Sequence, residues 1–185
     1  DIKRLYVCGE VAATGIMGAN RLASNSLIEC LVFANRAIED CANECCVDNI
    51  PSFEKCYMRD EENAQLYSTL KESVSEIMNT YAGIIRSEEG LSEGLREIDE
   101  LESMVEHIAA KYADSALCEY YIEASRRLIC VARLIMSPAL QRKESRGGHY
   151  REDYPSADER YAMHSIQRYG EPMTTAPVNS NYFNF

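Results

Sequence analysis

Residues 15–33 read GIMGANRLASNSLIECLVF, a turn rich in glycine and asparagine that runs directly into a long apolar segment. Gly15 and Gly18 allow the backbone to approach a neighbouring group closely, because neither carries a side chain. The segment after them is expected to be a helix whose first N–H groups, at Ser26 and Leu27, attract partial negative charge. This pattern is typical of a turn against which a ligand fits.

The sequence on both sides of this turn completes the local pattern. Residues 4–10 (RLYVCGE) form a short apolar run that ends in a glycine and a carboxylate, which is typical of a buried parallel strand. Ser24 and Asn25 are favourable N-cap residues for a helix over residues 26–43 that is apolar on nearly every face. Because such a strand and helix need a sheet to cover them, residues 1–47 are expected to end a larger α/β domain.

Two charged side chains lie close to the turn. Glu10 can accept hydrogen bonds from hydroxyl groups, and the planar guanidinium of Arg21 suits a carboxylate. The alternative is that Glu10 and Arg21 pair with each other in a loop that caps an ordinary helix. The spacing does not decide between them, because this glycine-rich turn is not a G-x-G-x-x-G sequence.

Composition excludes several classes of partner. The 185-residue chain is 46% hydrophobic and has a formal net charge of -11, which disfavours nucleic acid and anionic membrane surfaces. Its first residues lack the pattern of a signal peptide, and no apolar run reaches the roughly 18 residues of a membrane span. We therefore expect a cytoplasmic protein whose eight cysteines are reduced thiols.

Four of these cysteines are spaced C-x3-C-C-x9-C, at Cys41, Cys45, Cys46 and Cys56. Zinc sites usually contain paired C-x2-C sequences, and adjacent cysteines rarely bind one ion together. No metal site is therefore predicted, and oxidation of exposed thiols is the better-supported alternative.

Three later segments repeat apolar residues at steps of three and four, as amphipathic helices do. The first segment contains Leu66, Leu70, Ile77, Tyr81 and Ile84. The second contains Leu91, Leu95, Ile98, Val105, Ile108 and Tyr112, and the third contains Leu117, Tyr121, Ala124, Leu128, Val131 and Ile135. Breaks near residues 87–90 and 113–114 predict an antiparallel three-helix bundle. Pro138 predicts a kink or a new helix start.

The chain is thus predicted to be mainly α. Residues 1–47 supply the terminal strand and helix of an incomplete α/β domain, and residues 48–60 form a linker. The three-helix bundle covers residues 61–143, and an irregular tail covers residues 144–185.

Two stretches resemble a known family. Residues 5–37 (LYVCGEVAATGIMGANRLASNSLIECLVFANRA) are similar to the end of the flavin domain in the L-aspartate oxidase, succinate dehydrogenase and fumarate reductase family. Residues 141–155 (QRKESRGGHYREDYP) are similar to that family's ERKESRGxHxRxDYP. The sequence GANRLASNSL resembles the aspartate oxidase form more than the dehydrogenase form, GANRLGANSL. The family also ends in a three-helix domain.

The resemblance implies an FAD enzyme that oxidises L-aspartate to iminoaspartate in NAD biosynthesis, with oxygen or fumarate reoxidising the flavin. It implies that Glu10 contacts the ribityl region and that Asn25, Ser26 and Leu27 contact the isoalloxazine, the last two at its pyrimidine edge. Arg21 would then bind and orient the substrate carboxylate. A helix start at this place would stabilise the negative charge of a reduced flavin.

The chain departs from the family pattern at one position and covers only its C-terminal part. Met17 stands where most relatives have the histidine of HGANR, so one hydrogen-bond donor to a substrate carboxylate is missing. The N-terminal flavin-binding motif and the capping domain have no counterpart in this sequence. The chain alone is therefore expected to be inactive, to hold FAD poorly and to self-associate through its uncovered helix.

Two alternatives remain at this point. The chain could derive from a succinate dehydrogenase or fumarate reductase flavoprotein, or it could be a helical interaction module without catalytic activity. Among the histidines, His107 and His164 are expected to be ordinary surface or packing residues. His149 is expected to join a polar network that docks the tail on the flavin domain, together with Glu144, Arg146 and Arg151.

Overall fold

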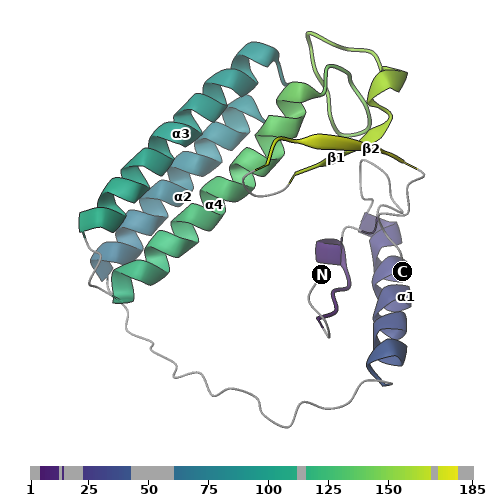
Figure 1. The fold of residues 1–185 in the computed structure, drawn as a ribbon, viewed down its shortest axis with the longest axis horizontal. Helices are drawn as coiled ribbons and strands as arrows, with labels where there is room; N and C mark the ends of the chain where they lie inside the picture. The colour runs from purple at the N-terminus through teal and green to yellow at the C-terminus, as the bar shows by residue number, and fades with distance from the viewer. Residues whose placement is uncertain are drawn as a thin grey trace. The chain divides into compact units, whose positions relative to one another are not determined.

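The computed structural model describes residues 5–12, 14, 23–42, 61–111, 116–167 and 171–178. This described part is mainly helical, as the sequence predicts, and it contains four α-helices and one two-stranded sheet (Figure 1). The chain divides into two compact units. The first comprises Asp1–Cys56 and also Phe185, and the second comprises Tyr57–Asn184. None of the helices in the described ranges has the length and hydropathy required to cross a membrane.

The first unit contains the 3-10 helix η1 (Glu10–Ala12) and the helix α1 (Ala23–Cys41). Gly9 adopts a φ of 82°, a left-handed conformation that glycine reaches without strain, and the chain turns there into η1. Residues 5–8 form no strand, so the strand predicted over residues 4–10 is wrong where the structure describes it. A strand exists only through pairing with a neighbour, and the described residues of this unit offer none.

Helix α1 begins at Ala23, three residues earlier than predicted. Ser24 and Asn25 therefore lie inside its first turn instead of acting as N-cap residues. The amides of this first turn, which begins at Ala23, lack an acceptor within the helix.

Polar contacts tie the preceding segment to α1. The Tyr6 hydroxyl donates to Asp40 Oδ2 at 2.7 Å, and the buried Thr14 hydroxyl donates to Glu29, which is buried as well. The apolar residues on other sides of α1 are uncovered, with Leu27, Ile28, Leu31 and Ile38 between 65% and 67% exposed. A helix with this much exposed apolar surface is suited to packing against further protein.

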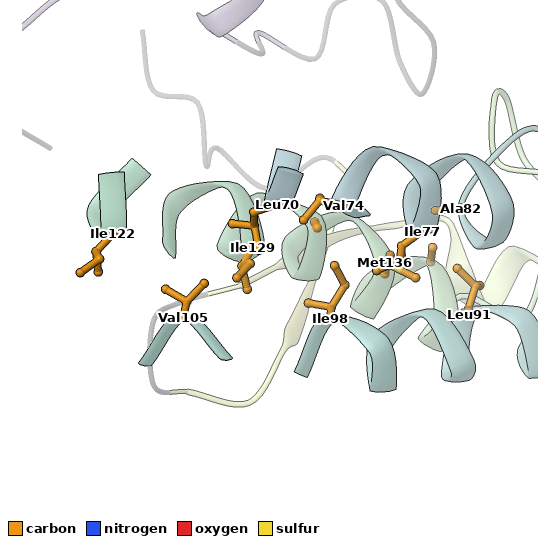
Figure 2. Packing of buried hydrophobic residues seen from close by; sticks show 12 residues of the cluster. Leu70, Val74, Ile77, Ala82, Leu91, Ile98, Val105, Ile122, Ile129 and Met136 are labelled. Atoms are coloured by element: carbon orange, nitrogen blue, oxygen red, sulfur yellow. The ribbon is translucent and has the colours of Figure 1, made fainter. Parts of the chain in front are cut away.

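The second unit is built on α2 (Glu61–Tyr81), α3 (Glu88–Lys111) and α4 (Ala116–Gln141), which pack side by side (Figure 1). Each helix directs a row of apolar side chains into one shared core (Figure 2). The core residues are Leu70, Val74, Ile77, Ala82, Leu91, Ile98, Val105, Ile122, Ile129, Ala132, Met136 and Ala139. Burial of these side chains, at roughly 25 cal/mol per Å² of apolar area, is the main stabilising contribution.

The sequence periodicity selected the correct face of α3 but not of α4. Val131 and Ile135, predicted as core positions, are 52% and 44% exposed, whereas Ile129 and Met136 are buried. Two adjacent apolar stripes run along α4, and spacing alone cannot say which of them meets α2 and α3. Ile84, also predicted to belong to the repeat, is 87% exposed in the turn after α2.

Pro138 neither kinks α4 into two helices nor starts a new one, because α4 is a single helix from Ala116 to Gln141. Proline has no N–H group, so the carbonyl four residues earlier, at Leu134, loses its normal partner. The side chain of Gln167 supplies the replacement, since its Nε2 donates to Leu134 O at 3.1 Å. The proline is thus accommodated by a hydrogen bond from the tail.

The tail is more ordered than the irregular segment predicted from its composition. It contains the 3-10 helix η2 (Glu159–Tyr161) and the strands β1 (Met163–Ile166) and β2 (Thr174–Pro177). The strands pair antiparallel, with Met163 opposite Pro177 and Ile166 opposite Thr174.

Gly94 permits the close approach of the three helices at the end of the core. A Cβ atom at this position would lie 2.3 Å from Met136 Cε and 2.8 Å from Tyr81 Cβ. The methionine end can rotate away, but the tyrosine Cβ is fixed to the α2 backbone. Any larger residue therefore forces α2 and α3 apart.

We expect Gly94→Ala to lower the free energy of unfolding by about 1–2 kcal/mol. Two contacts shorter than 3.0 Å place the steric cost in the upper part of the usual overpacking range, at about 2–3 kcal/mol, and helix propensity returns about 1 kcal/mol. Urea denaturation followed by circular dichroism measures the change. Gly148→Ala is the control, since a Cβ there meets nothing within 4 Å. Equal stability of the two variants would show that the packing around Gly94 is not tight.

Candidate functional site

The tail sequence ESRGGHYRED forms a polar cluster at one end of the three helices, and Arg151 is its most buried member. The Arg151 side chain is 0% exposed. Its Nη1 donates to Ala139 O at 3.0 Å and Leu140 O at 3.1 Å, which are carbonyls of the last turn of α4. No N–H group within the helix donates to these carbonyls, so the Arg151 guanidinium serves as the C-terminal cap of α4.

Asp153 links Arg151 to the start of the neighbouring helix, α3. Arg151 Nε and Nη2 donate to the two carboxylate oxygens of Asp153 at 2.7 and 2.6 Å. Asp153 Oδ2 also accepts from the Glu88 N–H at 2.9 Å, at the start of α3. The hydrogen bonds from Arg151 and the Glu88 amide outweigh desolvation and lower the pKa of Asp153 to about 2. The ion pair therefore places a cation at one helix C-terminus and an anion at another helix N-terminus.

Arg86 and His149 form a second contact beside the first. Arg86 Nε donates to Ala82 O at 3.2 Å and Gly83 O at 2.9 Å, just after the end of α2. Its Nη1 lies 3.0 Å from His149 Nδ1. The backbone is fixed too, because Arg86 N donates to Tyr150 O and Glu152 N donates to Arg86 O, at 3.1 and 2.9 Å. Arg86, which lies just after α2, is thereby joined to the tail through both its side chain and its backbone.

The protonation of His149 follows from its neighbours. A guanidinium only donates, so Nδ1 must accept from Arg86, and the proton is carried by Nε2, 3.2 Å from Arg142 O. Burial lowers the pKa of His149; the Arg142 carbonyl partly opposes this, and the charges of Arg86, Arg151 and Arg142 lower it further. The imidazole is therefore neutral with both nitrogens engaged, which disfavours a role as a general base.

Glu144 organises the rest of the cluster. Its side chain is 0% exposed and accepts from Arg142 Nη1 at 2.6 Å, Arg146 Nε at 3.0 Å and Asp158 N at 3.0 Å. Burial raises the pKa of Glu144, but the hydrogen bonds from the Asp158 amide, Arg142 and Arg146 outweigh it and lower the pKa overall. Arg142 also donates to the carbonyls of Tyr161 and Met163, and so connects α4 to η2 and β1.

The four tail residues singled out from the sequence are brought together within the second unit. His149 and Arg151, with Arg86 and Asp153, hold the tail against the ends of α2, α3 and α4. Glu144 contacts Arg142 just after α4, and Arg146 contacts Glu144 and Glu159 within the tail. Sequence reasoning missed Arg86 and Asp153. Arg86 follows a glycine just after a helical repeat, which is a usual place for a cationic cap, and this signal could have revealed it.

The residues predicted to contact a flavin and a substrate lie in the first unit. Arg21 is outside the described residues, as is the side chain of Asn25. Glu10 is exposed at the start of η1, and Ser26 and Leu27 lie near the start of α1, with Leu27 66% exposed. The structure therefore does not test whether these residues converge on one ligand.

The remaining candidate features of the described residues are metal-binding groups, cysteine thiols and cavities. Groups of three or more metal-binding side chains do not occur among the described residues. Cys8, Cys30, Cys41 and Cys130 are not in disulfide bonds among the described residues, and Cys45, Cys46 and Cys56 lie outside them. A cavity of about 200 Å³ lies between α2, α3 and α4, lined by residues including Leu66, Leu70, Val105 and Ile122. Its Thr69, Ser73 and Ser125 hydroxyls donate to carbonyls of their own helices.

Comparison with known proteins places the chain in a family. The family model for the fumarate reductase flavoprotein C-terminal domain matches residues 71–184, which include α3, α4 and the polar cluster. The chain belongs to this family. The cluster around Arg151 lies inside the matched region.

The curated relatives of this flavoprotein-family chain include L-aspartate oxidases. The chloroplastic enzyme of Oryza sativa is 38% identical over 177 residues, which cover 86% of this chain and 27% of the relative. The enzyme of Acinetobacter baylyi is 34% identical over 184 residues, which cover 97% of this chain and 33% of the relative. The chain thus spans about a third or less of the relatives it matches.

Solved structures have the same fold. The Mycobacterium smegmatis Sdh1 complex with UQ1 matches with a TM-score of 0.52 and 26% identity, over 88% of this chain and 30% of that one. The E. coli quinol fumarate reductase flavoprotein matches with a TM-score of 0.56 and 23% identity, over 89% and 32% of the two chains. The second likeness, at this identity, supports the fold alone.

We expect Arg151→Met to lower the free energy of unfolding by about 3 kcal/mol, the lower end for a broken buried ion pair, because Asp153 is still 30% exposed and can be rehydrated. Urea denaturation measures the loss. Arg160→Met is the matched control, because its pair with Asp158 is exposed and surface pairs contribute little. Similar losses in both variants would contradict the capping role of Arg151.

His149 should make stability depend on pH. Its folded pKa is depressed, so below pH 6.5 the unfolded chain binds more protons than the folded one, and stability should fall as the pH decreases from 6.5. His149→Gln, which can still accept from Arg86 and donate to Arg142 O, should flatten this slope between pH 5 and 7, where Asp153 stays ionised. Thermal melts at successive pH values measure it. His107→Gln, on the exposed face of α3, should keep the slope; a persistent slope in His149→Gln would refute the assignment.

Proposed function

We propose that this chain is the C-terminal part of an FAD enzyme that oxidises L-aspartate to iminoaspartate. The observation that carries the proposal is the continuous similarity to L-aspartate oxidases, at 34–38% identity over 86–97% of the chain in the rice and Acinetobacter baylyi enzymes. This similarity includes the GANRLASNSL stretch as well as the helical region. Oxygen or fumarate is the proposed acceptor for the electrons.

The described residues of the first unit supply hydrogen-bond donors and an acceptor suited to a flavin. Helix α1 begins at Ala23, shortly after the glycines of the sequence GIMGANRLA, so its first amides offer donors to an anionic ring edge. Glu10 is exposed at the start of η1, where its carboxylate can accept from hydroxyl groups. When bound, FAD supplies the hydride acceptor. We assign Glu10 to its ribityl hydroxyls and the start of α1, with Asn25, Ser26 and Leu27, to its pyrimidine edge.

Arg21 is the proposed substrate residue. Its guanidinium offers two parallel donors to a carboxylate of aspartate, which orients the substrate. Met17 cannot donate the hydrogen bond that a histidine would give at the same position, so Arg21 carries more of the orientation in this chain. The group that accepts the substrate proton is assigned to the portion of the protein beyond this chain.

The parts of the chain receive corresponding roles. Residues 1–47 are proposed to end the FAD-binding α/β domain, residues 48–60 to link it, residues 61–143 to form an antiparallel three-helix bundle, and residues 144–185 to dock on the flavin domain. The uncovered apolar face of α1 supports the first assignment, because Leu27, Leu31 and Ile38 need a cover. In the isolated chain, the same face supports self-association. A cytoplasmic location of this protein stays a prediction, since the rice relative is named as chloroplastic.

The test compares this chain alone with the complete protein encoded together with the upstream sequence. The chain alone should be colourless and inactive, whereas the complete protein should bind flavin and bleach anaerobically with L-aspartate. Arg21→Leu in the complete protein should keep the flavin but lower kcat/KM by at least about 100-fold, the effect of losing a bidentate charged contact of about 3 kcal/mol.

Arg36→Leu is the control for that variant, since Arg36 lies over the Phe33 ring on α1, 5.4 Å from the centroid, and should leave activity unchanged. A complete protein without flavin would refute the proposal, and so would full activity in Arg21→Leu. Oxidation of succinate without release of an amine from aspartate would assign the protein to the dehydrogenase branch. A helical interaction module would predict that deletion of residues 1–47 changes no property of the complete protein.

A further inference from the structure

Arg86 differs from the other arginines of the polar cluster because it has no acidic partner. Among the residues that the structure describes, no carboxylate oxygen lies within 4 Å of its guanidinium. The ion-paired arginines of the helical unit are Arg96, Arg126, Arg133, Arg142, Arg146, Arg151 and Arg160. In a chain with a net charge of -11, a partly buried cation with no acid beside it is unusual.

The guanidinium of Arg86 is nevertheless held in one orientation. Its Nε is bound to two carbonyls after α2, and its Nη1 is bound to His149. The main chain of Arg86 is bonded on both sides to residues 150 and 152 of the tail. A side chain that is already fixed loses little conformational entropy when it binds a ligand.

One nitrogen of the guanidinium is left without a partner. Nη2 of Arg86 makes no hydrogen bond within the described chain, and no fully buried polar side-chain atom there lacks a partner, so Nη2 is accessible to solvent. His149 adds no charge, because its Nδ1 accepts from Arg86. The pair therefore carries a single positive charge and one accessible donor nitrogen.

We propose that Arg86, held by His149, binds one carboxylate group through Nη2. Since Nε and Nη1 are already engaged, Nη2 is the nitrogen that donates a charge-assisted hydrogen bond to a carboxylate oxygen. The carboxylate belongs either to an acidic side chain of the rest of the flavoprotein or to a free dicarboxylate. This proposal depends on the geometry of Arg86 and His149 and is independent of aspartate oxidation.

The two sources can be separated with small probes on this chain. Acetate imitates an acidic side chain, and succinate imitates a free dicarboxylate. The titration is followed by NMR, using the Nε–H signal of Arg86 and the backbone amides of Tyr150 and Glu152, against sodium chloride of equal ionic strength. Arg86→Gln is the test variant, and Arg127→Gln is the control, because Arg127 is an exposed arginine of α4. Arg86→Lys, which keeps the charge without the fork, serves if Arg86→Gln does not fold.

Saturable shifts with acetate and succinate, retained in Arg127→Gln and lost in Arg86→Gln or reduced at least about threefold in affinity in Arg86→Lys, support the site. Affinities for acetate and succinate within about twofold of each other assign it to an acidic side chain, because only one carboxylate is then held. Binding of succinate about tenfold tighter assigns it to a free dicarboxylate with a second contact. The proposal is overturned if acetate and succinate cause chemical-shift changes no larger than those caused by sodium chloride. It is also overturned if the carboxylates shift the Tyr150 and Glu152 amides of Arg86→Gln as much as those of the unchanged chain.

Discussion

The helical unit depends on one buried guanidinium. Arg151 lies where α4 ends and α3 begins, and both ends leave backbone groups without partners inside their helices. A single ion pair with Asp153 satisfies both, since the cation faces carbonyls and the anion faces an amide. Each charge also opposes the helix dipole next to it, so the desolvation of a fully buried arginine is compensated by four hydrogen bonds in fixed directions.

The same requirement explains why the tail lies on this end of the helices. Several contacts between the tail and the helices go to backbone groups that a helix cannot satisfy itself. Arg86, joined to the tail, donates to the carbonyls after α2, His149 donates to Arg142 O, and Gln167 donates to the carbonyl that Pro138 leaves without a partner. Pro138 inside α4 and a glutamine almost thirty residues later are therefore parts of one arrangement. The tail is a cap for the helix ends, even though its composition resembles that of a loop.

The sequence predicted those features that depend on local periodicity. The repeat of α3 placed Leu91, Ile98 and Val105 in the core, where they are found. It failed on α4, because two apolar stripes lie side by side there and only the positions of α2 and α3 select between them. The pairing of β1 with β2 and the role of Asp153 depend on groups distant in the sequence, so no local pattern could reveal them.

The two units differ in what they need to be stable, and this difference affects the predicted flavin and substrate residues of the first unit. The helical unit buries a core of its own and satisfies its helix ends through the tail. Helix α1 keeps Leu27, Ile28 and Leu31 about two-thirds exposed, so it gains little from apolar burial within this chain. A ligand site at the start of α1 therefore depends on what covers this helix, whereas the cluster around Arg151 is complete within the described residues.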